Sequence, residues 1–137
     1  MPKPSRAYAH PALRWGLVLL WAGLIWGLSS IPDLSSGLPQ DFLLRKLAHG
    51  VAFGVLALLA RWALPPLRNR NHWFARDGYA GFIAVAYAVV DEIHQSYVPG
   101  RHGAATDVLI DGGGVVLALL LALAWRRLQT HRSAAAR

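Results

Sequence analysis

Four long apolar stretches occupy most of this 137-residue chain, and they cover residues 13–31, 42–64, 79–98 and 107–125. Each is close to the roughly 20 residues that an α-helix needs to cross the hydrocarbon core of a bilayer. Pro65 and Pro66 stop the second stretch, and Pro99 with Gly100 stops the third. Only short loops and tails remain. The sequence therefore predicts an all-α membrane protein, folded as a bundle of four transmembrane helices.

The composition favours the same class. Apolar residues make up 55% of the chain and charged residues only 15%, whereas about a quarter of an average soluble domain is charged. The absence of cysteine excludes a thiol nucleophile, a disulfide framework and a thiolate metal site. We expect one transmembrane domain over residues 1–137, with short basic tails at 1–12 and 126–137.

Basic residues are distributed unevenly between the two ends of the predicted bundle. If the amino terminus is cytoplasmic, eleven of the 14 Lys and Arg residues fall on the cytoplasmic side. The other three are Arg45, Lys46 and Arg101. Because basic residues are retained on the cytoplasmic side of a membrane, we expect both termini to be cytoplasmic. This distribution accounts for the net charge of +7 without a nucleic-acid partner.

Most ionisable side chains within the stretches fall in the outer half of the predicted bundle. They are Lys46, His49, Asp91, Glu92, His94, Asp107 and Asp111, with the neutral Gln95 among them. At about 100° per residue, all but His94 share a helix face with small residues such as Ala57, Ala88 and Gly114. Small residues mark surfaces where membrane helices approach closely, so these polar side chains should point into the bundle.

Two smaller expectations concern the first and the last helix. The first stretch has no ionisable residue in its interior, so we expect its helix at the periphery of the site. Thr106 stands just before the fourth stretch and is suited to cap that helix.

The polar cluster has two interpretations. Ionisable residues at membrane depth cost a few kcal/mol each and are functional by default. The alternative is a structural network in which Lys46 and Arg101 neutralise the acids and tie helices together. We favour a functional pocket, because apolar residues could replace a purely structural network at lower cost.

Each polar residue has a candidate role. Glu92 is the first candidate for a general base, with Asp91 or His49 as its partner in proton transfer. Lys46 and Arg101 are suited to hold an anionic group. The binding set is completed by Gln95, Asp107 and Asp111. The same carboxylates would suit a divalent cation, but their spacing is not diagnostic, and the metal question stays open. No cofactor-binding motif occurs, so none is expected.

At these residues the sequence resembles the VanZ-like family of small bacterial integral membrane proteins, named for a protein associated with teicoplanin resistance. The resemblance covers residues 38–120 best. Its motifs are Arg45-Lys46-x-x-His49-x-x-x-Phe53, Asp91-Glu92-Ile93-His94-Gln95, Pro99-Gly100-Arg101, Asp107 and Asp111-Gly112-Gly113-Gly114. The chain departs from the family pattern at Arg45, where an Asp is expected; Asp41, one turn earlier, would supply a carboxylate if the helix begins there.

The resemblance implies a multi-pass protein of the bacterial cell membrane, linked to the cell envelope and to antibiotic resistance of the teicoplanin type. It implies no particular reaction. Our leading hypothesis is a pocket on the outer side that engages a polar or anionic headgroup, including one carried by a lipid. Whether the pocket is catalytic stays open. The alternatives are a non-catalytic binding or partner protein and, less favoured, a proton or cation pathway, because the inner halves of the stretches are apolar.

Overall fold

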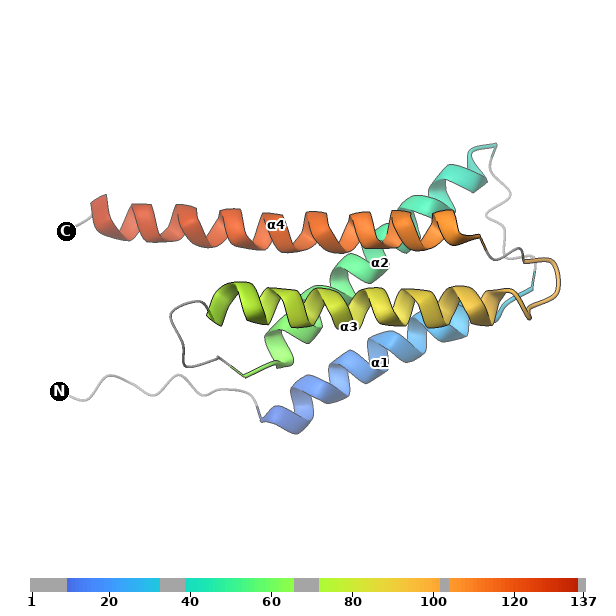
Figure 1. Ribbon diagram of the computed structural model, residues 1–137, viewed down its shortest axis with the longest axis horizontal. Helices are drawn as coiled ribbons and strands as arrows, with labels where there is room; N and C mark the ends of the chain where they lie inside the picture. Colours follow the sequence, from blue (N-terminus) through green and yellow to red (C-terminus); the bar gives the residue numbers. More distant parts are fainter. Residues whose placement is uncertain (1–9, 33–38, 66–71, 102–103, 136–137) are drawn as a thin grey trace.

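The described part of the chain is entirely helical. The computed structural model describes residues 10–32, 39–65, 72–101 and 104–135. These residues form four α-helices and no β-strand: α1 (Pro11–Ser29), α2 (Asp41–Ala63), α3 (His72–Gln95) and α4 (Ala105–Ala135). The helices alternate in direction, so α1 begins and α4 finishes at the same end of the bundle (Figure 1). The predicted all-α fold is confirmed.

Three helices have the length and composition of membrane spans. Among the described residues these are α1, α2 and the part of α4 from Ala105 to Ser133. The fourth, α3, is less apolar because it carries Arg76 and Asp77 near its start and Asp91, Glu92 and Gln95 in its last two turns. With 24 residues it is nevertheless about 36 Å long, and Asp91, Glu92 and Gln95 are buried inside the bundle. The helices thus have the character of a membrane protein.

Many of the buried residues are alanines, packed with a few larger side chains such as Phe53 and Leu56, and large apolar residues cover the outside. Ala57, Ala80 and Ala84 are 0% exposed. By contrast, Phe82 is 73% exposed and Leu109 is 75% exposed. An apolar surface of this kind is unfavourable in water and is suited to contact with lipid chains.

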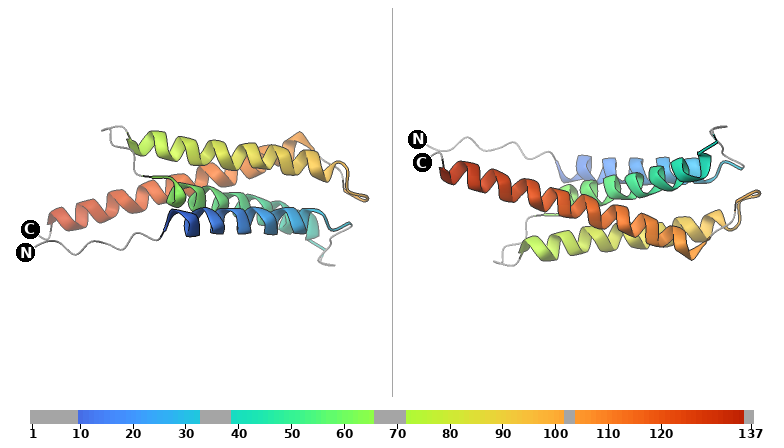
Figure 2. Two further views of the ribbon diagram at one scale, coloured as in Figure 1. Left: turned by 90° about the horizontal axis from the view of Figure 1, so that it is seen from below. Right: turned by 90° about the horizontal axis from the view of Figure 1, so that it is seen from above.

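The closest helix contact joins α2 and α4, which cross each other (Figure 2). A Cβ atom added to Gly54 would lie 3.0 Å from the carbonyl oxygen of Gly114 and 3.2 Å from Cβ of Ala118. A Cβ atom on Gly114 would overlap the main chain of Gly50. The Gly50-x-x-x-Gly54 sequence therefore lets the two backbones touch.

Two helix boundaries differ from the predicted stretches. α3 begins at His72, seven residues before the expected start, and α4 continues to Ala135. The residues 126–135 were expected as part of a basic tail, but they are rich in Arg, Leu, Gln and Ala, which are good helix formers. Thr106 lies in the first turn of α4, one residue inside the helix, so it does not occupy the capping position that we expected.

The first helix is joined to its neighbours by side-chain hydrogen bonds. Trp21 Nε1 donates to the carbonyl oxygen of Ala52 at 2.9 Å, and Tyr87 Oη donates to that of Ala22 at 2.7 Å. Within the described residues, no Cα atom of α1 lies within 8 Å of one in α4. α1 therefore packs on α2 and α3 alone.

Candidate functional site

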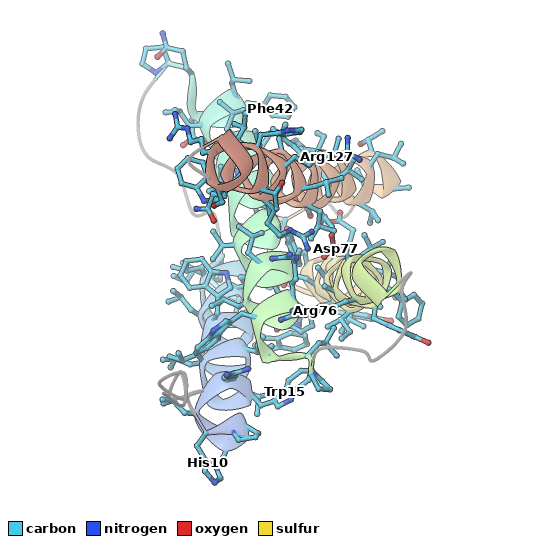
Figure 3. The ribbon with its side chains drawn as sticks, turned by 90° about the vertical axis from the view of Figure 1, so that its left-hand side faces the viewer. His10, Trp15, Phe42, Arg76, Asp77 and Arg127 are labelled. Carbon is cyan, nitrogen blue, oxygen red and sulfur yellow. The ribbon has the colours of Figure 1, made fainter. Side chains whose placement is uncertain are left out.

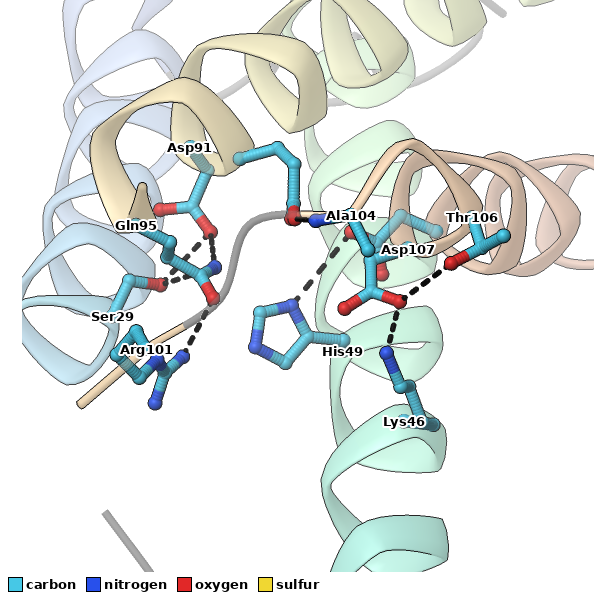
Figure 4. A network of polar contacts seen from close by, with 11 residues as sticks. Ser29, Lys46, His49, Asp91, Gln95, Arg101, Ala104, Thr106 and Asp107 are labelled. Carbon is cyan, nitrogen blue, oxygen red and sulfur yellow. Dashed lines mark hydrogen bonds and ion pairs between the residues drawn. The ribbon is translucent and has the colours of Figure 1, made fainter. Parts of the chain in front are cut away.

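The predicted polar residues converge at one end of the bundle, where α1 and α3 finish and α2 and α4 begin (Figure 4). We call this the acidic end, because it holds Asp91, Glu92, Asp107 and Asp111. Helical periodicity explains the convergence: each polar residue lies on the same face as the small residues through which its helix packs.

One chain of hydrogen bonds runs from α1 through α3 to the turn after it. The carboxylate of Asp91, 1% exposed, accepts from Ser29 Oγ at 2.8 Å and from Gln95 Nε2 at 2.7 Å. Arg101 Nη2 in turn donates to Gln95 Oε1 at 2.9 Å. Ser29 thus brings α1 into the site, whereas we had expected α1 at the periphery. The sequence signal was the Ser29-Ser30 pair that finishes an otherwise apolar stretch.

Two side-chain pairs join α2 to α4, and the one with His49 is an ion pair when the imidazole is protonated. His49 Nδ1 lies 3.7 Å from Asp111 Oδ2, and the carboxylate of Asp111 is almost fully buried. One turn earlier on both helices, Lys46 pairs with Asp107. Asp41, the first residue of α2, pairs with Arg45 at 2.9 Å. A carboxylate therefore stands one turn before Arg45, as expected.

Glu92 is buried at the junction of α3 and α4. Its carboxylate accepts a hydrogen bond from the main-chain nitrogen of Ala104, which directly precedes α4. It thereby satisfies one of the unpaired donors at the start of that helix, the role expected of Thr106.

His94 points away from the other polar residues of the acidic end. Its ring stacks on Trp26 of α1 at 3.8 Å between centroids, and Nε2 lies 2.9 Å from Ser30 Oγ. This agrees with its position outside the polar arc of α3.

A cavity of about 410 Å³ opens at the acidic end. Its polar lining comprises Ser29, Arg45, Lys46, His49, Gln95, Arg101, Asp107 and Asp111. Its apolar lining comprises Ile25, Leu28, Phe42, Ala48, Ala52 and Ile110. All four helices contribute to the lining of the cavity, and α2 contributes the most residues. Asp91 and Glu92 are not among the lining residues but lie behind the wall.

Two cavity residues carry buried polar atoms without a hydrogen-bond partner in the described structure: Nη1 of Arg101 and Oδ1 of Asp111. Arg101 contacts the neutral Gln95 and makes no ion pair with the described residues. A buried donor and a buried acceptor left unpaired each cost about 1–3 kcal/mol, so the polar groups beside the cavity are less stable than a fully paired set would be.

The described residues contain no group of three or more His, Asp or Glu side chains that could hold a metal ion. The carboxylates face the bases on neighbouring helices instead, as Lys46–Asp107 and His49–Asp111 do. Hydrogen bonds and ion pairs among side chains therefore connect the described residues of the site.

These features define a helical membrane protein with a polar cavity at one end of its bundle. A family model described as VanZ/LLP1 matches residues 12–126. The chain belongs to the VanZ/LLP1 family, which confirms the resemblance found in the sequence. No curated protein and no solved structure matches the chain.

Proposed function

We propose that the cavity at the acidic end binds the headgroup of an amphiphile. The observation that carries this proposal is that two charged side chains line the cavity beside its apolar wall: Arg101, which makes no ion pair with the described residues, and Asp111. A headgroup that complements them presents an anionic oxygen to Arg101 and a hydroxyl donor to Asp111. A lipid whose headgroup contains both a phosphate and a sugar or glycerol has both groups.

The cavity's apolar wall favours a ligand with a hydrocarbon chain. Ile25 and Leu28 of α1 and Ile110 of α4 line this wall, and among the described residues no Cα atoms of these two helices lie within 8 Å of each other. A chain attached to the headgroup can lie against this wall and remain continuous with the bilayer. Burial of each CH₂ group would contribute about 0.8 kcal/mol.

We further propose four spans with both termini in the cytoplasm. Six of the arginines described, including Arg14, Arg61 and Arg126, lie at the end opposite the cavity or beyond it on α4, and basic residues are retained in the cytoplasm. The cavity then lies in the outer leaflet of the bacterial cell membrane, where lipid-linked envelope precursors are exposed. A protein that engages such a precursor could alter the response to teicoplanin-type antibiotics, which act at the envelope.

The test is to identify what copurifies with the full chain from bacterial membranes in mild detergent. We expect an amphiphile with a phosphate or sugar headgroup, detected by mass spectrometry. Arg101→Gln should reduce its retention about ten-fold or more, since a hydrogen bond to a charged group contributes about 1.5–3 kcal/mol. Arg132→Gln, at an exposed position near the far end of α4, is the matched control. Equal retention by Arg101→Gln and Arg132→Gln would refute the proposed binding site.

A catalytic form of the same site is the second candidate. The observation in its favour is the His49–Asp111 pair on the cavity wall, in which the carboxylate can orient the imidazole for proton transfer. Glu92 and Asp91, behind the wall, would support this chemistry. Replacing His49 by Gln should abolish turnover and preserve affinity if the site is catalytic, whereas a binding site should lose affinity.

A proton or cation pathway is less favoured. Between the two ends the buried residues are apolar, among them Phe53, Leu56, Ala84 and Val115. They offer no ionisable relay across the described part of the bundle.

A further inference from the structure

A second polar cluster lies at the other end of the bundle (Figure 3). The carboxylate of Asp77, near the start of α3, forms ion pairs with Nε of Arg61 at 2.5 Å and with Nη2 of Arg126 at 2.8 Å. The neighbouring Arg76 donates through Nε to the main-chain oxygen of Arg61 at 2.7 Å. These four residues, from α2, α3 and α4, are called the arginine cluster below.

Positive charge exceeds negative charge in the arginine cluster. Arg61 and Arg126 both pair with Asp77, and Arg76 beside them bonds to a main-chain oxygen, whereas Lys46 and Arg45 at the acidic end each have a carboxylate of their own. The side chains of Arg61 and Arg126 are only 16% and 24% exposed. Partly buried cations next to hydrocarbon need a counter-charge, so the cluster is suited to a further anion.

Two tryptophans indicate the depth of the arginine cluster in the bilayer. Trp62 follows Arg61 and is 38% exposed, and Trp125 precedes Arg126 and is 63% exposed. Exposed tryptophans are enriched at the level of the lipid headgroups. The anions available at that level are lipid phosphates.

We propose that the arginine cluster binds the phosphate of an anionic phospholipid in the leaflet at that end. Guanidinium groups match phosphate oxygens with paired, charge-assisted hydrogen bonds. The rival interpretation is that the cluster only fastens α2, α3 and α4 together. This site is separate from the cavity and does not depend on the function proposed for it.

The test compares the full chain in nanodiscs of phosphatidylcholine alone and in nanodiscs that also contain phosphatidylglycerol. A lipid that binds only the folded state raises the melting temperature. We expect phosphatidylglycerol to raise the melting temperature of the wild type and of Arg127→Gln. In Arg76→Gln we expect the rise in melting temperature to be about half that of the wild type or smaller. Arg127 is the matched control because it is the exposed neighbour of Arg126 and takes no part in the ion pairs of Asp77.

A second variant keeps the proposal testable if Arg76→Gln does not fold. Asp77→Asn removes the only carboxylate of the arginine cluster, so phosphatidylglycerol should raise its melting temperature more than that of the wild type. A cluster that only fastens helices predicts no such increase. Equal rises in Arg76→Gln and Arg127→Gln would overturn the proposal. The proposal would also be overturned if Arg101→Gln, rather than Arg76→Gln, lost the rise in melting temperature. It would be overturned as well if inorganic phosphate, added to phosphatidylcholine nanodiscs, raised the melting temperature as much as phosphatidylglycerol does.

Discussion

The hydroxyl of Ser29 lies 2.8 Å from Oδ2 of Asp91, although 62 residues separate them in the chain. Both residues are buried, with 2% and 1% of their surface exposed. This bond fixes the last turn of α1 against the acidic residues of α3. It makes α1 a wall of the cavity as well as a membrane anchor.

Ser29→Ala should lower the free energy of unfolding by about 1–3 kcal/mol, because it removes one of the donors to a buried carboxylate. Ser96→Ala is the control: Ser96 is exposed, and its hydroxyl donates only to the nearby carbonyl of Ile93. Unfolding in detergent by added sodium dodecyl sulfate gives both values. Equal stability of the two variants would show that the Ser29–Asp91 bond contributes nothing.

Gly114→Ala should destabilise the bundle by about 1–3 kcal/mol, since the new methyl group overlaps the main chain of Gly50 and forces α2 and α4 apart. Gly113→Ala provides a matched comparison on the adjacent residue, where a Cβ atom meets nothing within 4 Å. There, the higher helix propensity of alanine should be neutral or stabilising by up to about 1 kcal/mol. Melting temperatures in the same detergent test the contrast, which disappears if α2 and α4 do not meet at Gly114.

Glu92→Gln should leave a folded, normally abundant protein and abolish whatever envelope phenotype the protein confers. The glutamine oxygen can still accept the bond from Ala104, while the charge and the basicity are lost. Lys46 keeps Asp107 as its partner, so the substitution strands no cation there. A full phenotype with normal stability would remove Glu92 from the site. Loss of phenotype together with about 3 kcal/mol or more of stability would favour a structural network.

Reporter fusions test the four-span topology. An enzyme active only outside the cytoplasm should work after residue 36 or residue 103, and should fail after residue 70 or at the carboxyl end. The reasoning is the unequal distribution of Lys and Arg between the two ends. The opposite pattern of activity would place the cavity on the cytoplasmic side.

Helical periodicity predicted much of the fold from the sequence. The polar arcs of α2, α3 and α4 placed Asp91, Gln95 and Asp111 inside the bundle, and all three are buried. It succeeded because in a membrane the interior face is marked by small residues as well as by polar ones, so two independent signals agree.

The partners of the polar residues could not be predicted from periodicity. Periodicity indicates which face of a helix a side chain lies on, but not which residue of another helix it contacts. Ser29 has no charge and lies at the edge of an apolar stretch, where a serine is ordinary. Asp77 falls before the expected start of the third stretch, and its contacts depend on α3 beginning a full two turns earlier. The roles of Glu92 and His49 in function remain predictions.

The contact between Gly50 and Gly114 also brings two cavity-lining side chains close together. His49 directly precedes Gly50, and Asp111 lies three residues before Gly114, so both side chains leave their helices within a turn of the point where the backbones touch. The distance of 3.7 Å between His49 Nδ1 and Asp111 Oδ2 therefore depends on the close approach of these two glycines. Because neither glycine has a side chain, α2 and α4 cross closely enough for the polar groups beside the crossing to meet.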